Sequence, residues 1–282
     1  MHDKSSTNHE DRISGAALVG NMWQYALSVF YPTRALKEMG LYTPTRIGVR
    51  PPQPEREGMG PYFSKRYPFP VLLEDRPDQY ELVEEFDRIS REYERFTQPF
   101  SGPIFEETLG VMRDYLRPDW RILDTSCGAG TEATELAVCV PQGEVVGADL
   151  AAEMVQTTFE NARRSGIGNM AFFQADVAHM PGEFGGMFDA TFCSLAFHHY
   201  PDPKGSVEEM YRVLHPGGYA FIADPGPDWY KRISEWIAEW ADPGWIGFHN
   251  GDEFRSRCEA AGFRYYYWEE LLPGIGLVIA QK

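Results

Sequence analysis

A run of small residues between an apolar segment and a polar one could bind a cofactor. Residues 122–131 read Ile-Leu-Asp-Thr-Ser-Cys-Gly-Ala-Gly-Thr, so a short apolar strand would end at Asp124 and break into a glycine-containing turn. Such a turn brings bare backbone N–H groups and the N-terminus of the next helix against a ligand, which bulky side chains would prevent. These residue types indicate a ligand cradle at the end of a strand.

Two cofactors use a turn of this kind, and the surrounding charge distinguishes them. The segment from Gly128 to Ala133 also satisfies the dinucleotide pattern G-x-G-x-x-G/A, which is a weak signal alone. A pyrophosphate needs uncompensated N–H donors, yet Asp124 closes the strand and Glu132 opens the helix. S-adenosylmethionine (SAM) carries a cationic sulfonium and ammonium, which carboxylates stabilise. The sequence therefore favours SAM over a nicotinamide dinucleotide.

Two further aspartates follow the next two predicted strands and suit the rest of SAM. Asp149 ends the second strand, where a carboxylate can accept hydrogen bonds from both ribose hydroxyls. A helix N-cap is the alternative role for Asp149. Asp176 could accept from the adenine amino group while the backbone N–H of Val177 donates to the ring. The alternative for Asp176 is an ordinary loop aspartate.

Two adjacent histidines, His198 and His199, follow the fourth predicted strand. A neutral imidazole near pH 7 can take the proton from a phenol, enol or ammonium as it is methylated. The alternative is one structural histidine and one that bridges loops. His249 is a second candidate base, with a surface loop histidine as its alternative. No metal site is expected, because adjacent histidines point apart and no further pair at i, i+4 completes a ligand set.

These candidate residues fall where predicted strands and helices alternate, as in a mostly parallel sheet covered on both faces. Seven strands are expected, at residues 122–124, 144–149, 170–174, 188–194, 219–224, 263–268 and 276–280. Helices separate the first five strands, and another helix covers residues 252–261. Only residues 269–274 join the last two strands, which is too short for a parallel crossover, so these strands should form an antiparallel hairpin.

The N-terminal third has a different character. Residues 11–40 are predicted to be helical. Residues 43–70 contain so many prolines and glycines that regular structure is not expected, and they should form a linker or a covering strap. Helices are predicted again over residues 78–95 and 104–116, because Pro99 and Pro103 interrupt the pattern between them.

Length and composition bound the type of protein and its partners. A chain of 282 residues accommodates one α/β domain, residues 93–282, and an extension, residues 1–92, read as a lid, a pocket wall or a homodimer contact. The formal charge of −16 repels phosphate backbones and anionic lipids, which disfavours nucleic-acid and membrane partners and favours a small molecule. Four widely spaced cysteines and a polar N-terminus fit a cytoplasmic protein.

The segment after the fifth predicted strand, residues 225–250, is unusually aromatic. Variable segments after strands commonly build the pocket for a substrate. Its large aromatic side chains would suit a flat or apolar acceptor: Trp229, Tyr230, Trp236, Trp240 and Trp245. The alternative is that these side chains are simply part of a core, as aromatic residues along a helix often are.

Five segments, taken together and in order, carry a family resemblance: residues 123–130, 146–150, 174–176, 197–202 and 214–219. They resemble the motifs of class I SAM-dependent methyltransferases, and most of all the ubiquinone/menaquinone-biosynthesis type that acts on small molecules. The resemblance covers residues 93–282. It implies a Rossmann-like α/β fold with a seven-stranded, mostly parallel sheet and an antiparallel last strand, which agrees with the hairpin expected above.

The resemblance also implies contacts with the cofactor. The turn residues Ser126, Cys127, Gly128 and Gly130 would pack against the methionine and the ribose. The other implied contacts are Asp124 and the carbonyl of Leu195 with the ammonium, Tyr93 with the carboxylate, Asp149 and Leu150 with the ribose, and Asp176 and Val177 with the adenine. For Tyr93, a core tyrosine is the alternative. Ser126 stands where the family usually has its first glycine.

The expected function is methyl transfer from SAM to oxygen or carbon of a small aromatic, quinone-like or polyketide-like acceptor, with His198 or His199 as base. One alternative keeps the fold and the cofactor but catalyses a reaction without methylation, such as a cyclisation. A nicotinamide oxidoreductase is the other alternative, and Asp124 and Glu132 disfavour it.

Overall fold

The computed structural model describes residues 37, 39–67, 69–72, 80–226, 235–236, 238 and 244–282. Nearly all of the helix predicted over residues 11–40 lies outside these ranges, as do Trp229, Tyr230 and Trp240. None of the helices in the described part of the chain is long and apolar enough to cross a membrane.

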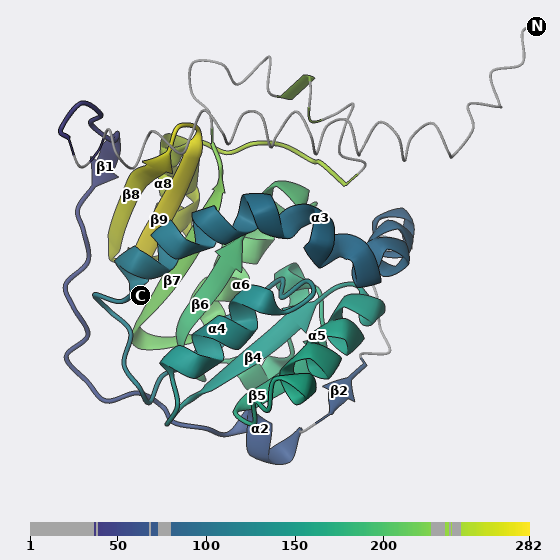
Figure 1. The fold of residues 1–282 in the computed structure, drawn as a ribbon. Coiled ribbons are helices and arrows are strands. Elements are labelled where there is room, and N and C mark those ends of the chain that lie inside the picture. The colour runs from purple at the N-terminus through teal and green to yellow at the C-terminus, as the bar shows by residue number, and fades with distance from the viewer. Residues whose placement is uncertain are drawn as a thin grey trace, which may run out of the picture.

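One twisted sheet forms the centre of the described structure (Figure 1). Its strands are β1 (Arg46–Gly48), β2 (Pro70–Val71), β3 (Arg121–Asp124), β4 (Glu144–Asp149), β5 (Met170–Gln174), β6 (Phe188–Ser194), β7 (Leu214–Pro225), β8 (Tyr265–Leu272) and β9 (Ile275–Gln281). They lie in the order β1-β8-β9-β7-β6-β3-β4-β5-β2. The pairs from β2 to β7 are parallel, whereas β9 is antiparallel to both β7 and β8.

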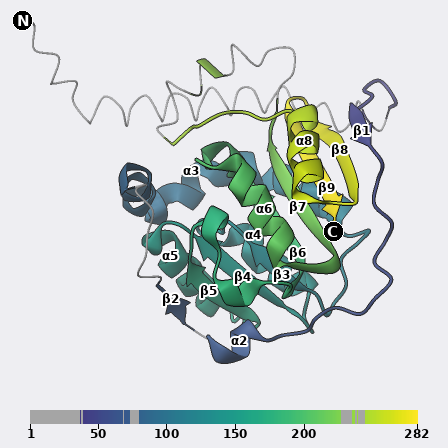
Figure 2. The same cartoon turned by 180° about the vertical axis from the view of Figure 1, so that it is seen from behind.

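Helices cover both faces of this sheet. The face turned to the viewer in Figure 1 carries α3 (Tyr80–Met112), α4 (Thr131–Cys139) and α5 (Ala152–Arg164). The opposite face, in front in Figure 2, carries α6 (Pro203–Val213) and α8 (Gly251–Ala261). Short helices are α2 (Phe63–Arg66), η1 (Val177–His179), η2 (Gly182–Phe184) and η3 (Phe197–His199). The strands alternate their apolar side chains between two buried clusters, one beneath each helical layer.

The predicted Rossmann-like fold with a reversed last strand is confirmed, but the sheet has nine strands rather than seven among the described residues. The two additional strands, β1 and β2, come from the proline-rich segment for which no regular structure was expected. Each is only two or three residues long and pairs at one edge of the sheet. Because an edge strand needs hydrogen bonds on one side only, proline is tolerated there.

The two helices predicted around Pro99 and Pro103 are one continuous helix, α3, so the expected break is wrong. A proline inside a helix costs about 3 kcal/mol. The segment that follows the prolines buries Ile104, Phe105 and Met112, and each buried side chain of this size contributes about 1.5–3 kcal/mol. Packing on the sheet therefore outweighs the local preference for a break.

The strands β7 and β8 also depart from the predicted boundaries. β7 begins at Leu214 instead of residue 219, because its irregular start pairs with Phe188 across a register shift. β8 extends to Leu272, which pairs with Ile275, so only Pro273 and Gly274 form the turn of the hairpin. Gly274 has a positive φ of 77°, which suits glycine in a tight turn.

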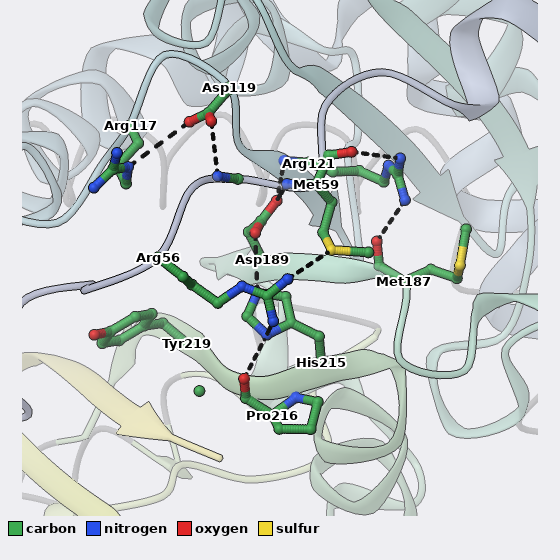
Figure 3. Close-up of polar contacts among 12 residues, drawn as sticks. Arg56, Met59, Arg117, Asp119, Arg121, Met187, Asp189, His215, Pro216 and Tyr219 are labelled. Atoms are coloured by element: carbon green, nitrogen blue, oxygen red, sulfur yellow. Dashed lines mark hydrogen bonds and ion pairs between the residues drawn. The ribbon is translucent and has the colours of Figure 1, made fainter.

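A strap, defined as residues 49–62, crosses the amino-terminal ends of the parallel strands (Figure 3). The Asp189 carboxylate accepts hydrogen bonds from the backbone N–H groups of Met59 (2.8 Å) and Arg121 (2.7 Å) and lies 2.9 Å from His215 Nε2. The Arg121 guanidinium donates to the backbone carbonyls of Met59, Gly60 and Met187. This network connects the strap to β3 and β7 at the amino-terminal ends of the strands. The candidate site lies at their carboxyl ends.

The strap leads into α2 through a buried ion pair. Glu144, which is fully buried, lies 2.8 Å from Arg121 Nε and accepts hydrogen bonds from the backbone N–H groups of Tyr62, Phe63 and Ser64. Its carboxylate therefore satisfies the donors at the start of α2, which have no partner within the helix. The Phe63 ring then packs in the core, stacked on Phe188 at 5.4 Å between ring centres.

Candidate functional site

Residues from five strands meet at the carboxyl ends of the strands because parallel strands end on the same side of the sheet. Asp124, Asp149 and Asp224 lie at the carboxyl ends of β3, β4 and β7, while Asp176 and Leu195 follow β5 and β6. In open α/β sheets, ligands bind in the crevice outside these ends. The topology thus brings together carboxylates that lie up to a hundred residues apart in the chain.

The turn between β3 and α4 has the conformation that its glycines permit. Gly128 and Gly130 have positive φ values of 50° and 90°, and α4 starts directly after Gly130. A Cβ atom on Gly130 would lie 2.4 Å from Thr158 Cγ2, so α5 leaves no room for a side chain there. Thr158 also donates a hydrogen bond to the Gly128 carbonyl at 2.6 Å. Contacts with α5 therefore hold the turn in place.

Asp124 has the environment expected of a residue that binds a cation. Its carboxylate is buried, and within the described part of the chain it accepts a long hydrogen bond of 3.3 Å from the backbone N–H of Ser126. Desolvation, together with the charges of Glu132 and Asp149, raises the pKa of Asp124 well above its usual range. A buried anion of this kind is costly until a cation compensates it. The turn therefore fits the sulfonium and ammonium of SAM better than a pyrophosphate.

Glu132 and Asp149 add to this negative region. Desolvation raises the pKa of Glu132 to about 7, and it raises the pKa of Asp149 to about 6 although backbone N–H groups oppose the shift. Asp149 accepts hydrogen bonds from the backbone of Gly128 (2.9 Å) and Ala151 (3.0 Å). A carboxylate has about four acceptor sites, so Asp149 retains acceptor capacity for a ribose hydroxyl. The Leu150 carbonyl next to it accepts from the Gln174 side chain.

Asp176 and Val177 lie at the end of β5. Asp176 caps η1 by accepting from the backbone N–H of Ala178, and its other oxygen lies 2.9 Å from Nδ1 of the exposed His179. The hydrogen bond to Asp176 raises the pKa of His179. Val177 is buried. Asp176 therefore caps a short helix, and its carboxylate retains acceptor capacity.

Leu195 carries backbone strain next to the candidate bases. Its φ of 50° makes it the one non-glycine residue with a positive φ in the described ranges. Its N–H donates to the Ala223 carbonyl of β7 at 2.8 Å, so the neighbouring strand holds it in this conformation. Strain of this kind persists where the surroundings determine it and clusters at functional sites. The backbone at Leu195 is where the resemblance places a contact with the ammonium.

His198 forms a buried pair with Asp224. Its Nδ1 lies 2.9 Å from Asp224 Oδ1, and both side chains are at most 8% exposed. A carboxylate at Nδ1 selects the tautomer that carries its proton there. The His198 carbonyl accepts from the backbone N–H groups of Ile246 (2.8 Å) and Gly247 (3.3 Å). Of the candidate bases, His198 therefore has the geometry of an oriented imidazole.

The other two histidines have different surroundings. The ring centre of His199 lies 4.1 Å from that of His198 and 5.3 Å from that of Phe86. His199 therefore belongs to the same cluster as His198. His249 is buried, not on the surface, and its ring packs edge-on against Phe197 and Phe254.

The predicted pocket aromatics are only partly described. Trp236 is 72% exposed, so its side chain lies on the surface. Trp245 is half-buried and packs edge-on against Phe248, whose ring lies 5.9 Å from that of His198. The side chain of Tyr93, within α3, lies outside the described part of the structure. Cys127 is buried beneath the turn, and desolvation raises the pKa of its thiol.

Two residues were given no role in the sequence prediction, although each has a signal in the sequence. Asp224 is an acidic residue at the end of a predicted parallel strand adjacent to the histidine strand. Tyr200 follows the two histidines, and its hydroxyl lies 2.6 Å from Ser126 Oγ. The sequence signal for the contact between Tyr200 and Ser126 is the serine itself, which stands where the family usually has a glycine. Among the described residues, no group of three His, Cys, Asp or Glu side chains could hold a metal ion.

Comparison with known proteins identifies relatives of this architecture. Residues 116–269, more than half of the chain, match a family model described as a methyltransferase domain. A demethylmenaquinone methyltransferase of Thermus thermophilus is 36% identical over 107 residues, which cover 38% of this chain and 48% of that protein. A nocamycin O-methyltransferase of Saccharothrix syringae is 30% identical over 152 residues, 54% of this chain and 52% of that protein. The chain thus spans about half the length of these two relatives.

The architecture also has counterparts among solved structures. The crystal structure of the YcgJ protein of Bacillus subtilis superposes with a TM-score of 0.51 at 26% sequence identity. The superposition covers 56% of this chain and 68% of that one.

Proposed function

Because the chain belongs to the class I SAM-dependent methyltransferases, we propose that it transfers the methyl group of SAM to oxygen or carbon of a small-molecule acceptor. The observation that carries this proposal is the position of two groups on the side of the sheet where the parallel strands end. Asp124 is a buried carboxylate that accepts a long hydrogen bond from Ser126, and His198 is an imidazole oriented by Asp224. The first suits the cationic methyl donor, and the second suits an acceptor that must lose a proton.

The chain's own residues would hold SAM in an order set by the strands. Asp124 and the backbone at Leu195 would accept from the ammonium, Asp149 from the ribose, and Asp176 with Val177 would contact the adenine. SAM supplies a methyl group already activated by the sulfonium. The protein therefore needs to align acceptor and methyl group and to exclude water. Transfer would break the carbon–sulfur bond as the bond to the acceptor forms, and would release S-adenosylhomocysteine.

His198 would take the proton that the acceptor loses. With its Nδ1–H directed at Asp224, the imidazole receives the proton on Nε2, and the carboxylate stabilises the resulting imidazolium. Two aromatic side chains lie beside these histidines, since the ring of Phe248 packs on His198 and the ring of Phe86 packs on His199. Such walls favour a flat, apolar acceptor. The names of the two relatives, which specify a quinone precursor and nocamycin, support a small molecule of an aromatic, quinone-like or polyketide-like kind.

A turnover assay tests this function. The purified chain should bind SAM in a calorimetric titration and should convert it to S-adenosylhomocysteine in the presence of hydroxylated quinones or phenols. SAM binding with product formation but without S-adenosylhomocysteine would indicate the non-methylating alternative. Tight NADH binding without SAM binding would indicate the oxidoreductase and contradict the proposal.

The affinity for SAM should depend on pH between about 5.5 and 8. Glu132, with a pKa of about 7, and Asp149, with a pKa of about 6, are increasingly protonated as pH falls through this range. Protonation removes the negative charge that attracts the cation, so affinity should rise with pH and binding should release protons. In the free protein, these raised pKa values mean that the native state binds more protons than the unfolded chain. Its stability should therefore fall as pH rises from about 4 to 7.

Calorimetry at constant ionic strength, in buffers of different ionisation enthalpy, measures both the affinity and the proton release. An affinity that stays constant from pH 5.5 to 8 would show that these carboxylates do not act on the cofactor.

A further inference from the structure

Ser126 is the one position of the cofactor turn where the chain departs from the usual glycine. Its backbone does not require glycine, because the turn places positive φ values at Gly128 and Gly130 and not at Ser126. A side chain is therefore tolerated at this point, and its Oγ lies 2.6 Å from the hydroxyl of Tyr200. The serine thus makes a contact with a residue on another loop that a glycine could not make.

The direction of this hydrogen bond follows from counting protons. The Ser126 hydroxyl donates to the Thr125 carbonyl at 2.8 Å, and the Thr125 hydroxyl donates to the Phe192 carbonyl at 3.1 Å. Each hydroxyl has one proton, so both can only accept from Tyr200. The phenol has one proton as well, and Ser126 Oγ is nearer than Thr125 Oγ1, which lies at 3.1 Å. Tyr200 therefore donates to Ser126, and the Cys193 thiol, 3.3 Å away, completes the cluster.

The cluster is buried, and it connects the turn after β3 with the segment that carries His198 and His199. Tyr200 is 6% exposed, and its ring packs against Phe197 at 5.2 Å between centres. Desolvation raises the pKa of its phenol well above the usual range, so the hydroxyl keeps its proton. One end of the hydrogen bond lies in the turn that follows Asp124. The other end lies directly after His198 and His199 in the chain.

We infer that Tyr200 is a positioning residue that fixes the cofactor turn relative to His198 through its hydrogen bond to Ser126. The inference rests on the proposed function, in which the turn holds the methyl donor and His198 receives the acceptor's proton. Removing the Tyr200 hydroxyl leaves the residues of the turn and His198 unchanged but removes the hydrogen bond that connects them. Alignment of donor, acceptor and base should then suffer more than the binding of either ligand.

A double-mutant cycle with Tyr200→Phe and Ser126→Ala tests this coupling. The affinity of each variant for SAM is measured by calorimetry, and kcat and KM are measured at saturating SAM. Tyr200→Phe should weaken SAM binding by no more than about fivefold, the typical effect of one hydrogen bond, and should lower kcat by about tenfold or more. KM for the acceptor should change little. Ser126→Ala should have a similar effect, and the double variant should be no worse than either single variant.

Tyr219→Phe is the matched control. Tyr219 is also a buried tyrosine, but it lies in β7 and its hydroxyl donates to the Pro52 carbonyl at the amino-terminal side of the sheet. This variant should lose stability without losing kcat. An equal loss of kcat in the control, additive losses in the cycle, or an unchanged kcat in Tyr200→Phe would each overturn the coupling. If the wild-type chain does not bind SAM, the proposed function fails and the coupling fails with it.

Discussion

Replacement of His198 by alanine is expected to lower kcat for methyl transfer by about 10²- to 10⁴-fold, the usual contribution of a general base. The affinity for SAM should change little, because the proposed function assigns the imidazole to the acceptor's proton and not to the methyl donor. The pH dependence of kcat near neutrality should also become flatter. Steady-state rates across pH 6–9, with calorimetric SAM binding in parallel, measure all three effects.

Two further variants make this experiment specific. Asp224→Asn preserves the volume of the side chain but removes the charge that stabilises the imidazolium, so kcat should fall although His198 is intact. His249→Ala removes a histidine that packs against Phe197 and Phe254, and it should affect stability more than kcat. If His249→Ala loses as much activity as His198→Ala, or if His198→Ala retains full activity, His198 is not the base.

Replacement of Glu144 by alanine is expected to cost about 3–5 kcal/mol of unfolding free energy, the range for breaking a buried ion pair. The substitution leaves the Arg121 guanidinium without its carboxylate in a buried position and leaves three backbone N–H groups at the start of α2 without their acceptor. Urea denaturation of the two proteins gives the difference in free energy.

Glu208→Ala is the appropriate comparison, because Glu208 also pairs with a cation but does so on the surface of α6. Exposed pairs contribute little, so this variant should leave the urea midpoint almost unchanged. A loss below about 1 kcal/mol in Glu144→Ala would mean that water enters the site and replaces the missing carboxylate.

The core of the fold could be predicted because its signals are local. The bounds of β4, β5 and β6 match their predicted ranges, since continuous apolar runs that end at polar residues are characteristic of buried parallel strands. The reversal of β9 followed from the length of a connection. By contrast, β1 and β2 depend on partners at opposite edges of the sheet, and α3 continues through two prolines because of the core that it covers. No local pattern contains that information.

The candidate site likewise has features that the sequence predicts and features that depend on residues distant in the chain. Asp124, Asp149 and His198 could be identified individually, because each lies at or just after a strand end. The pairing of His198 with Asp224 requires knowing that β6 and β7 are neighbours, and the contact of Ser126 with Tyr200 requires knowing how two loops face each other. Sequence predicted the positions of chemical groups, whereas their partners depended on topology.

The two short strands at the ends of the sheet have a consequence for solubility. An exposed edge strand offers unpaired N–H and C=O groups to another chain and is a common start of aggregation. Here β8 and β5, which would otherwise form long edges, are each partly covered by two or three residues, and one of these is Pro70. Such short edges provide little template for further strand addition. We therefore expect that β1, which precedes the strap, and β2, which follows α2, disfavour self-association at the two edges of the sheet.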